Sequence, residues 1–180
     1  MPISMYQASV PLFRSLLGGL SGVLEKGAAF AAAKGVDPSV LINDRLAPDM
    51  FPLSRQVQIA CDMAKGGAAR LAGAELPSWE DNETTFADLK ARIAKTLAFI
   101  DGFTPEQIDG SEAREIVLAM RSGELRFTGQ RYLIGFVIPN VSFHCATAYN
   151  ILRHNGVDVG KRQDLLCGRK VRVQRRLLQG

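Results

Sequence analysis

Residues 130–156 read QRYLIGFVIPNVSFHCATAYNILRHNG, and this stretch predicts a long helix that ends at Gly156. A glycine after the last helical turn readily adopts the left-handed conformation of a helix cap. Pro139 lies inside the helix and should kink it, because proline lacks the N–H that would bond to the carbonyl four residues earlier. The residues around His144 are mostly apolar, so we expect this helix to expose little surface.

Three further long helices precede this one. Apolar residues recur every three or four positions in residues 5–34, which predicts an amphipathic helix. A second helix should run from residue 52 or 54 to about residue 72. A third should follow Thr85-Phe-Ala-Asp88, which resembles a capping box, and end near residue 100. Four long helices with apolar stripes indicate an all-α fold, a four-helix bundle.

A short β-hairpin is predicted before the last helix. Residues 115–120 and 124–128 are strand-like and flank the turn Arg121-Ser-Gly123. Two strands alone are only marginally stable, so the hairpin should pack against the helices.

The composition of the chain is typical of a globular protein. The chain has 180 residues, of which 47% are hydrophobic and 22% charged, as is usual for one globular domain. No stretch approaches the roughly 20 uncharged apolar residues of a membrane span, so we expect no membrane association. No signal peptide is visible. Three cysteines without a spacing motif favour reduced thiols in the cytoplasm.

Basic residues gather at the end of the chain. Residues 161–180 carry seven Lys and Arg against one Asp, a net charge of +6, so residues 1–160 carry −2 of the total of +4. We therefore divide the chain into a helical bundle domain, residues 1–160, and a basic tail, residues 161–180. No aromatic side chains interleave with the basic ones as stacking platforms would require. We expect a solvated, poorly ordered tail and no nucleic-acid partner.

Polar residues at helical spacing predict a pocket between two of the helices. Asn140 and His144 are four residues apart and share a face, as do Gln58 and Asp62 on the helix that ends near residue 72. Helix bundles build sites from inward side chains on facing helices, and two tyrosines could add hydroxyls at the rim. The predicted pocket comprises Gln58, Asp62, Asn140, His144, Tyr6 and Tyr149.

The chemistry of this pocket leaves alternatives open. His144 is either a core histidine satisfied by hydrogen bonds or a ligand or general base. Gln and Asn are weak, neutral ligands, and only Asp62 would bring charge to a zinc, nickel or manganese ion held by His144 with Gln58, Asn140 or Asp62. The chain has no phosphate-binding glycine loop, serine elbow or CxxC motif, which argues against common nucleotide-binding and hydrolase classes.

Long blocks of the sequence follow one another in a characteristic order. They are Met5-Tyr6-x-Ala8-Ser9-Val10-Pro11, Arg45-Leu-Ala-Pro-Asp-Met-Phe-Pro-Leu53, Arg55-Gln-Val-Gln-Ile-Ala60, Phe127-Thr-Gly129, Pro139-Asn140, Phe143-His144 and Tyr149-x-Ile151-Leu-Arg-His-Asn-Gly156. Over roughly residues 1–162 the chain resembles an uncharacterised bacterial family, the domain of unknown function numbered nineteen-ninety-three. That family is grouped with the DinB/YfiT-like four-helix bundles, which are often dimeric and of which many carry a divalent metal on three histidines.

The resemblance implies that one of three metal ligands is retained. The last helix of the superfamily commonly contains His-x-x-x-His, and the match at residues 152–156 places the second histidine at His144 and the first at Asn140. The third ligand begins a His-Ile-Ala-like stretch and falls on Gln58. The resemblance thus implies a shared cavity with a degenerate metal site.

Three functions are consistent with these observations, and whether the protein is an enzyme stays open. The first is a bundle that binds a small molecule in the polar pocket without a tight metal site. The second, implied by the resemblance, is a divalent-metal-dependent thiol transferase or hydrolase. The third is a non-catalytic, homodimeric structural or stress-related protein whose polar residues only fix helix register.

Overall fold

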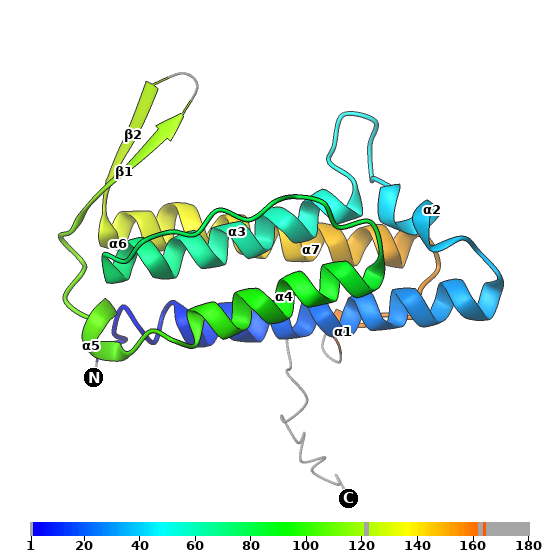
Figure 1. Cartoon of the computed structure of the whole chain (residues 1–180), viewed down its shortest axis with the longest axis horizontal. Helices are drawn as coiled ribbons and strands as arrows, with labels where there is room; N and C mark the ends of the chain where they lie inside the picture. Colours follow the sequence, from blue (N-terminus) through cyan, green and yellow to red (C-terminus); the bar gives the residue numbers. More distant parts are fainter. Residues whose placement is uncertain (1, 121–122, 162–163, 165–180) are drawn as a thin grey trace, which may run out of the picture.

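Four long helices lie lengthwise beside one another in the computed structural model (Figure 1). They are α1 (Val10–Lys34), α3 (Leu53–Ala72), α4 (Phe86–Ile100) and α7 (Ile138–His154). The structure describes residues 2–120, 123–161 and 164. Apart from positions 161 and 164 the predicted basic tail lies outside the described residues, as do hairpin turn residues 121–122. The predicted four-helix bundle is confirmed.

The order of the helices produces one long crossing connection. α3 and α4 run in the same direction, opposite to α1 and α7 (Figure 1). α3 packs against α4 and α7, and α1 packs against the same two helices. Because α3 and α4 are parallel, the chain between them must return along the bundle. We call this connection, residues 73–85, the strap.

Local sequence signals account for the helix ends. Gly35 and Gly73 end α1 and α3 with φ angles of 64° and 67°, in the left-handed region that glycine adopts without strain. The capping box at the start of α4 is present, with Thr85 and Asp88 each bonding the backbone of the other. The short helix α2 (Pro38–Asn43) follows α1. The ends of α1 and α3 and the start of α4 match their predictions.

The start of the first helix differs from its prediction. Residues 5–8 form a turn, and α1 begins at Val10 instead of residue 5. Pro11 explains the difference, because its missing N–H could not bond the carbonyl of Gln7 inside a longer helix, whereas its fixed φ suits a first turn. A further short helix, α5 (Pro105–Ile108), was not predicted.

The long helix predicted over residues 130–155 is interrupted. It consists of α6 (Gly129–Tyr132), a π-helical turn η1 (Leu133–Val137) and α7. Pro139 lies in the first turn of α7, so the irregular turn sits where its missing N–H disturbs the helix. The Asn140 side chain donates a hydrogen bond of 2.7 Å to the carbonyl of Phe136 in this turn. The expected disturbance by proline therefore takes the form of a π turn.

The predicted hairpin is present and leans on the last helical segment. β1 (Glu115–Met120) pairs antiparallel with β2 (Gly123–Thr128), and the two strands project from one end of the bundle (Figure 1). Ile116 and Leu118 are buried. Phe127 of β2 lies opposite Ile116, with its ring centre 5.9 Å from that of Tyr132 and 5.5 Å from that of Phe136.

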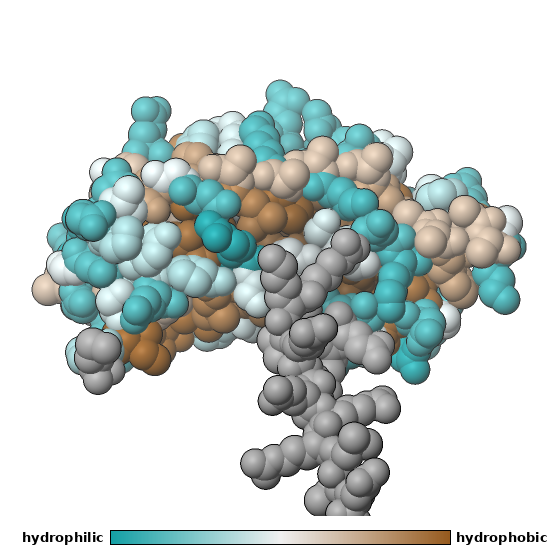
Figure 2. All heavy atoms as spheres, turned by 90° about the horizontal axis from the view of Figure 1, so that it is seen from below, coloured by the Kyte–Doolittle hydropathy of each residue, from teal (hydrophilic) through white to brown (hydrophobic). Residues whose placement is uncertain are grey.

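Apolar side chains fill the centre of the bundle, and the surface is mixed. In the view from below, hydrophilic and hydrophobic residues are interspersed (Figure 2). Within the described ranges, no helix combines the length and apolar character that crossing a membrane requires. The cytoplasmic location stays a prediction.

Candidate functional site

The strap bounds a polar pocket on α4. The pocket has a volume of about 640 Å³ and lies between strap residues and one face of the helix. On α4 the lining residues fall at helical spacings of three and four, which places them on one face. The lining residues are Ser78, Trp79, Glu80, Asn82, Glu83, Asp88, Ala91, Arg92 and Lys95.

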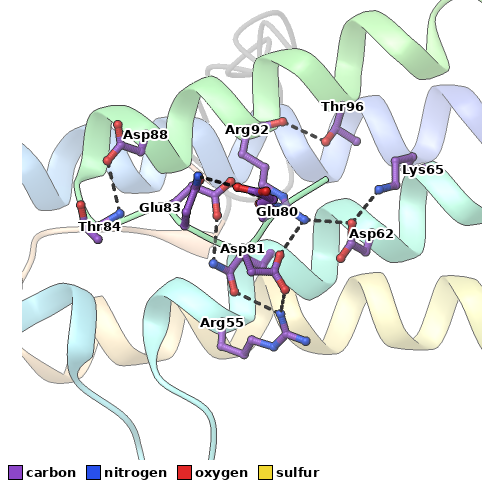
Figure 3. Close-up of polar contacts among 12 residues, drawn as sticks. Arg55, Asp62, Lys65, Glu80, Asp81, Glu83, Thr84, Asp88, Arg92 and Thr96 are labelled. Atoms are coloured by element: carbon purple, nitrogen blue, oxygen red, sulfur yellow. Dashed lines mark hydrogen bonds and ion pairs between the residues drawn. The ribbon is translucent and has the colours of Figure 1, made fainter. Parts of the chain in front are cut away.

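Arg92 lies at the floor of this pocket in a cluster of ion pairs (Figure 3). Its side chain is 2% exposed. One terminal nitrogen lies 3.0 Å from Asp62 and 2.9 Å from Asp81, and the other lies 2.9 Å from Glu83 and donates to the carbonyl of Glu80 at 2.8 Å. We call Arg92, Asp62, Asp81 and Glu83 the Arg92 cluster. It joins α3, α4 and the strap at one point.

The cluster keeps its guanidinium charged. Burial alone would lower the pKa of Arg92, but the hydrogen bond to Glu83 and the charges of Asp62 and Asp81 outweigh it and raise that pKa. A buried charge is tolerated when it is paired and hydrogen-bonded in this way. Among the described residues, two buried side-chain nitrogen or oxygen atoms lack a hydrogen-bond partner, and the Arg92 Nε is one of them.

Two predicted pocket residues take part in these contacts. The Gln58 amide donates to Glu83 at 2.9 Å and accepts from Arg55 at 3.2 Å, and Arg55 also pairs with Asp81 (Figure 3). Asp62 accepts from Lys65 at 3.0 Å in addition to Arg92. Gln58 and Asp62 thus lie under the strap, on the face of α3 that meets α4.

Trp79, the only tryptophan of the chain, lies among cations. The ammonium groups of Lys65 and Lys95 are 4.1 Å and 4.5 Å from the centre of its ring. Cations are attracted to the faces of aromatic rings at such distances. The ring of Phe99 meets Trp79 edge-on at 6.1 Å. These contacts hold the Trp79 side chain of the strap against α3 and α4.

His144 belongs to a different polar contact. Its Nδ1 lies 2.7 Å from Oε1 of Gln56. Because the Gln56 amide nitrogen donates to the carbonyl of Phe51 at 2.9 Å, its oxygen faces the imidazole, and we assign the proton to Nδ1. Burial, and secondly the positive charge of Arg55, lower the pKa of His144. The imidazole is held in its neutral form.

The structure does not bring the six predicted pocket residues into one group. Asn140 bonds its own helix, and the Tyr149 hydroxyl donates to the carbonyl of Val159 at 3.3 Å. Tyr6 is half-buried, and its backbone N–H donates to Asp109 at 2.7 Å. Within the described ranges, no hydrogen bond links His144 to Gln58. His144 therefore stands apart from the strap pocket.

Sequence reasoning missed the two partners that matter most. Arg92 lies three residues after Leu89 on the buried face of α4, so a charge interrupts an apolar stripe there. That interruption, together with the acidic run around Asp81 and Glu83, was the available signal. The sequence could not show whether Gln56 or Gln58 contacts His144, because the register of α3 against α7 was unknown.

A second, larger pocket lies beside the hairpin. It has a volume of about 720 Å³ and contains none of the predicted site residues. Its lining residues are Ala113, Glu115, Arg126, Phe127, Thr128, Arg131 and Gly135. Glu115 and Arg126 pair with one another at 2.8 Å and are both exposed. We regard the strap pocket as the better candidate, because its charges are prearranged by buried contacts.

Comparison with known proteins identifies the family. The family model described as domain of unknown function (DUF1993) matches residues 5–165. The chain belongs to this family. A crystal structure described as a DinB family member protein from Shewanella denitrificans is 44% identical to this DUF1993 chain, with 91% of this chain and 92% of that chain covered and a TM-score of 0.82. The resemblance found in the sequence is confirmed. No curated protein matches the chain.

The donor set of this DUF1993 chain does not fit the divalent metal that its superfamily implies. In the part of the chain that the structure describes, no three His, Cys, Asp or Glu side chains gather as a metal site would require. Both groups of the Gln58 amide are already bonded, and the Asp62 carboxylate pairs with Arg92 and Lys65. A carboxylate shared by two cations has little charge left for a third.

Proposed function

We propose that the protein binds a small polar molecule in the strap pocket and uses no tightly bound metal. The observation that carries this proposal is a pocket whose rim offers charges of both signs. Glu80, Asp88 and Lys95 line it and are exposed, while Glu83 and Arg92 at its floor satisfy one another. Sites for small molecules place a few polar groups around a concave surface in this way.

The arrangement of charges favours a ligand that is itself doubly charged. Asp88 and Lys95 are seven residues apart on α4, which separates them by about 10 Å along the helix. Ala91 lies between them and leaves room. A zwitterion of tripeptide length would place its ammonium near Asp88 and Glu80 and its carboxylate near Lys95.

Fluorescence of Trp79 tests this proposal, because the ring lines the pocket and is the only tryptophan. We expect triglycine to change its emission in a saturable manner, and both N-acetyl-triglycine and triglycinamide to bind more weakly. The variants Lys95→Met and Glu80→Gln should each weaken triglycine binding several-fold. Arg126→Met, which removes an exposed cation from the hairpin, is the matched control. Triglycine binding that Lys95→Met leaves unchanged would contradict this assignment.

The metal-dependent enzyme is the alternative, and metal content separates the two. We expect wild-type protein, incubated with zinc, nickel and manganese and then desalted, to retain no stoichiometric metal by plasma mass spectrometry. Metal that is retained by the wild type and lost in His144→Ala would support the enzyme instead. It would also justify a screen of thiol-transfer and hydrolytic substrates.

We also propose that the chain forms a homodimer, as the resemblance to often-dimeric bundles implies. Ile134 of η1 and Phe143 of α7 are 56% and 55% exposed, and we propose that they contribute to the interface. Light scattering after size-exclusion chromatography should give twice the mass of one chain. In Phe143→Ser the measured mass should fall towards that of a single chain. A monomeric wild type at all concentrations would exclude the dimer.

A further inference from the structure

We propose that the strap is a movable cover over the polar face of α3, and that the Arg92 cluster holds it closed by charge. This inference goes beyond the binding function and does not depend on any ligand. It makes Arg92 a positioning residue. The cover would control access to Gln58 and Lys65, the buried α3 side chains beneath it.

The strap has little apolar attachment to the bundle. None of residues 73–85 is buried, and only Pro77, Trp79 and Glu83 are half-buried. Leu76, its one aliphatic side chain larger than alanine or proline, is 37% exposed. Segments with few buried apolar contacts open at lower free energy than the helices that flank them.

Polar contacts replace the missing apolar ones. Arg92 alone contacts three residues of the strap at 2.8–2.9 Å. Its partners are the carbonyl of Glu80 and the carboxylates of Asp81 and Glu83. From α3, Arg55 pairs with Asp81, and Gln58 donates to Glu83 at 2.9 Å. The centre of the strap is therefore attached through charged and polar groups of two helices.

Loss of the guanidinium would leave an excess of negative charge beneath the strap. Asp62, Asp81 and Glu83 converge on Arg92 within 3.0 Å. Without that cation, Lys65 would still pair with Asp62 and Arg55 with Asp81, but Glu83 would lose its ion pair, and three carboxylates would face two cations, so that like charges repel. Two of the three belong to the strap, which is the less firmly packed partner. The strap should move away into water while the helices stay in place.

Opening would expose a defined surface. Gln58 is 5% exposed, and the Lys65 side chain is 6% exposed. Asp62, between them on α3, is 34% exposed on its side chain. A ligand entering from the strap side would thus meet the Gln58 amide and the Lys65 ammonium group, which are covered in the closed arrangement, beside the partly exposed Asp62 carboxylate.

The test compares Arg92→Met with Arg92→Lys and with Arg126→Met, which removes an exposed arginine that pairs with two carboxylates of the hairpin. Acrylamide quenching of Trp79 reports on the strap, and a glutamate-specific protease can cut it after Glu75, Glu80 or Glu83. In Arg92→Met we expect quenching to rise about twofold and strap cleavage to accelerate about tenfold or more, the scale expected when a buried ion pair loses one partner. Arg92→Lys should be intermediate, and circular dichroism should show intact helices.

Two results would overturn the proposal. One is unchanged quenching and cleavage in a folded Arg92→Met protein. The other is cleavage spread over the helices together with lost helicity, which would make the cluster a stabiliser of the whole bundle. If Arg92→Met does not fold, Asp81→Asn decides the question, because it removes only a partner that is 36% exposed. It should still raise strap cleavage selectively, and its failure to do so would equally overturn the proposal.

Discussion

His144 shows how a single hydrogen-bond chain fixes the state of an ionisable side chain. The Phe51 carbonyl orients the Gln56 amide, and the oxygen of that amide accepts a hydrogen bond from the Nδ1–H of His144. Protonating the second ring nitrogen would place a charge in a site where burial and Arg55 both oppose it. The residue therefore has a structural explanation that needs no ligand.

The stability of the protein should depend on pH through His144. Its pKa in the folded state lies below the ordinary 6.5, so the unfolded chain binds the proton more readily. The contribution of the neutral imidazole is fully present above about pH 6.5 and is lost as the pH falls through the folded pKa. Urea unfolding between about pH 7 and pH 5 should show a free energy that falls on acidification, less steeply in His144→Gln. Equal slopes in the wild type and in His144→Gln would contradict the assignment.

At the scale of elements, two adjacent glycines of α3 have opposite surroundings. A Cβ on Gly67 would lie 2.7 Å from Val137 of η1 and 3.3 Å from the ring of Phe13 in α1, both in the packed core. A Cβ on Gly66 would meet the end of the flexible Arg70 side chain. Glycine at position 67 thus permits the close approach of three helical segments.

Alanine substitutions should separate these two positions. Gly67→Ala should lower the free energy of unfolding by about 1–3 kcal/mol, because core atoms must move to make room. Gly66→Ala should be neutral or stabilising, because alanine favours a helix over glycine by about 1 kcal/mol and arginine can swing away. Denaturant unfolding measures both, and equal destabilisation would contradict this packing.

At the scale of the whole molecule, two buried thiols report on opening of the bundle. Cys61 of α3 and Cys145 of α7 are fully buried. Burial raises the pKa of Cys61 to about 12 and raises that of Cys145 further above its ordinary value. A thiol reagent at neutral pH should modify these two cysteines only when α3 and α7 separate.

Labelling of these thiols should therefore follow global unfolding. We expect mass spectrometry to find Cys61 and Cys145 unmodified in native protein, and both modified in denaturant with the same midpoint as the loss of helix signal. Strap variants such as Arg92→Lys should leave the protection of Cys145 unchanged, because burial and Cys61, and no group of the Arg92 cluster, shape the surroundings of this thiol. Rapid native labelling of either thiol would contradict a closed bundle.

The sequence was sufficient to predict features that depend on a few neighbouring residues. It was insufficient for features that depend on how one helix is placed against another. The capping box at Thr85 and the left-handed glycine at position 156 after α7 are decided within a few residues, and both were predicted. Whether Gln56 or Gln58 meets His144 depends on how α3 is rotated against α7, which no local pattern records. The partnership of Arg92 with strap carboxylates likewise depends on the path of an irregular segment. Consequently the fold and most element ends were predictable, and the grouping of the polar side chains was not.

The extended length of the strap exceeds the distance that it must span. The strap runs back along α3 (Figure 1), which has 20 residues and measures about 30 Å at 1.5 Å per residue, whereas the segment from residue 73 to residue 85 reaches about 43 Å when extended at 3.3 Å per residue. The spare contour lies before Trp79, because residues 79–83 are held by their side chains. Insertions and deletions among relatives should accordingly be tolerated between residues 74 and 78, while the spacing from Trp79 to the start of α4 stays constant.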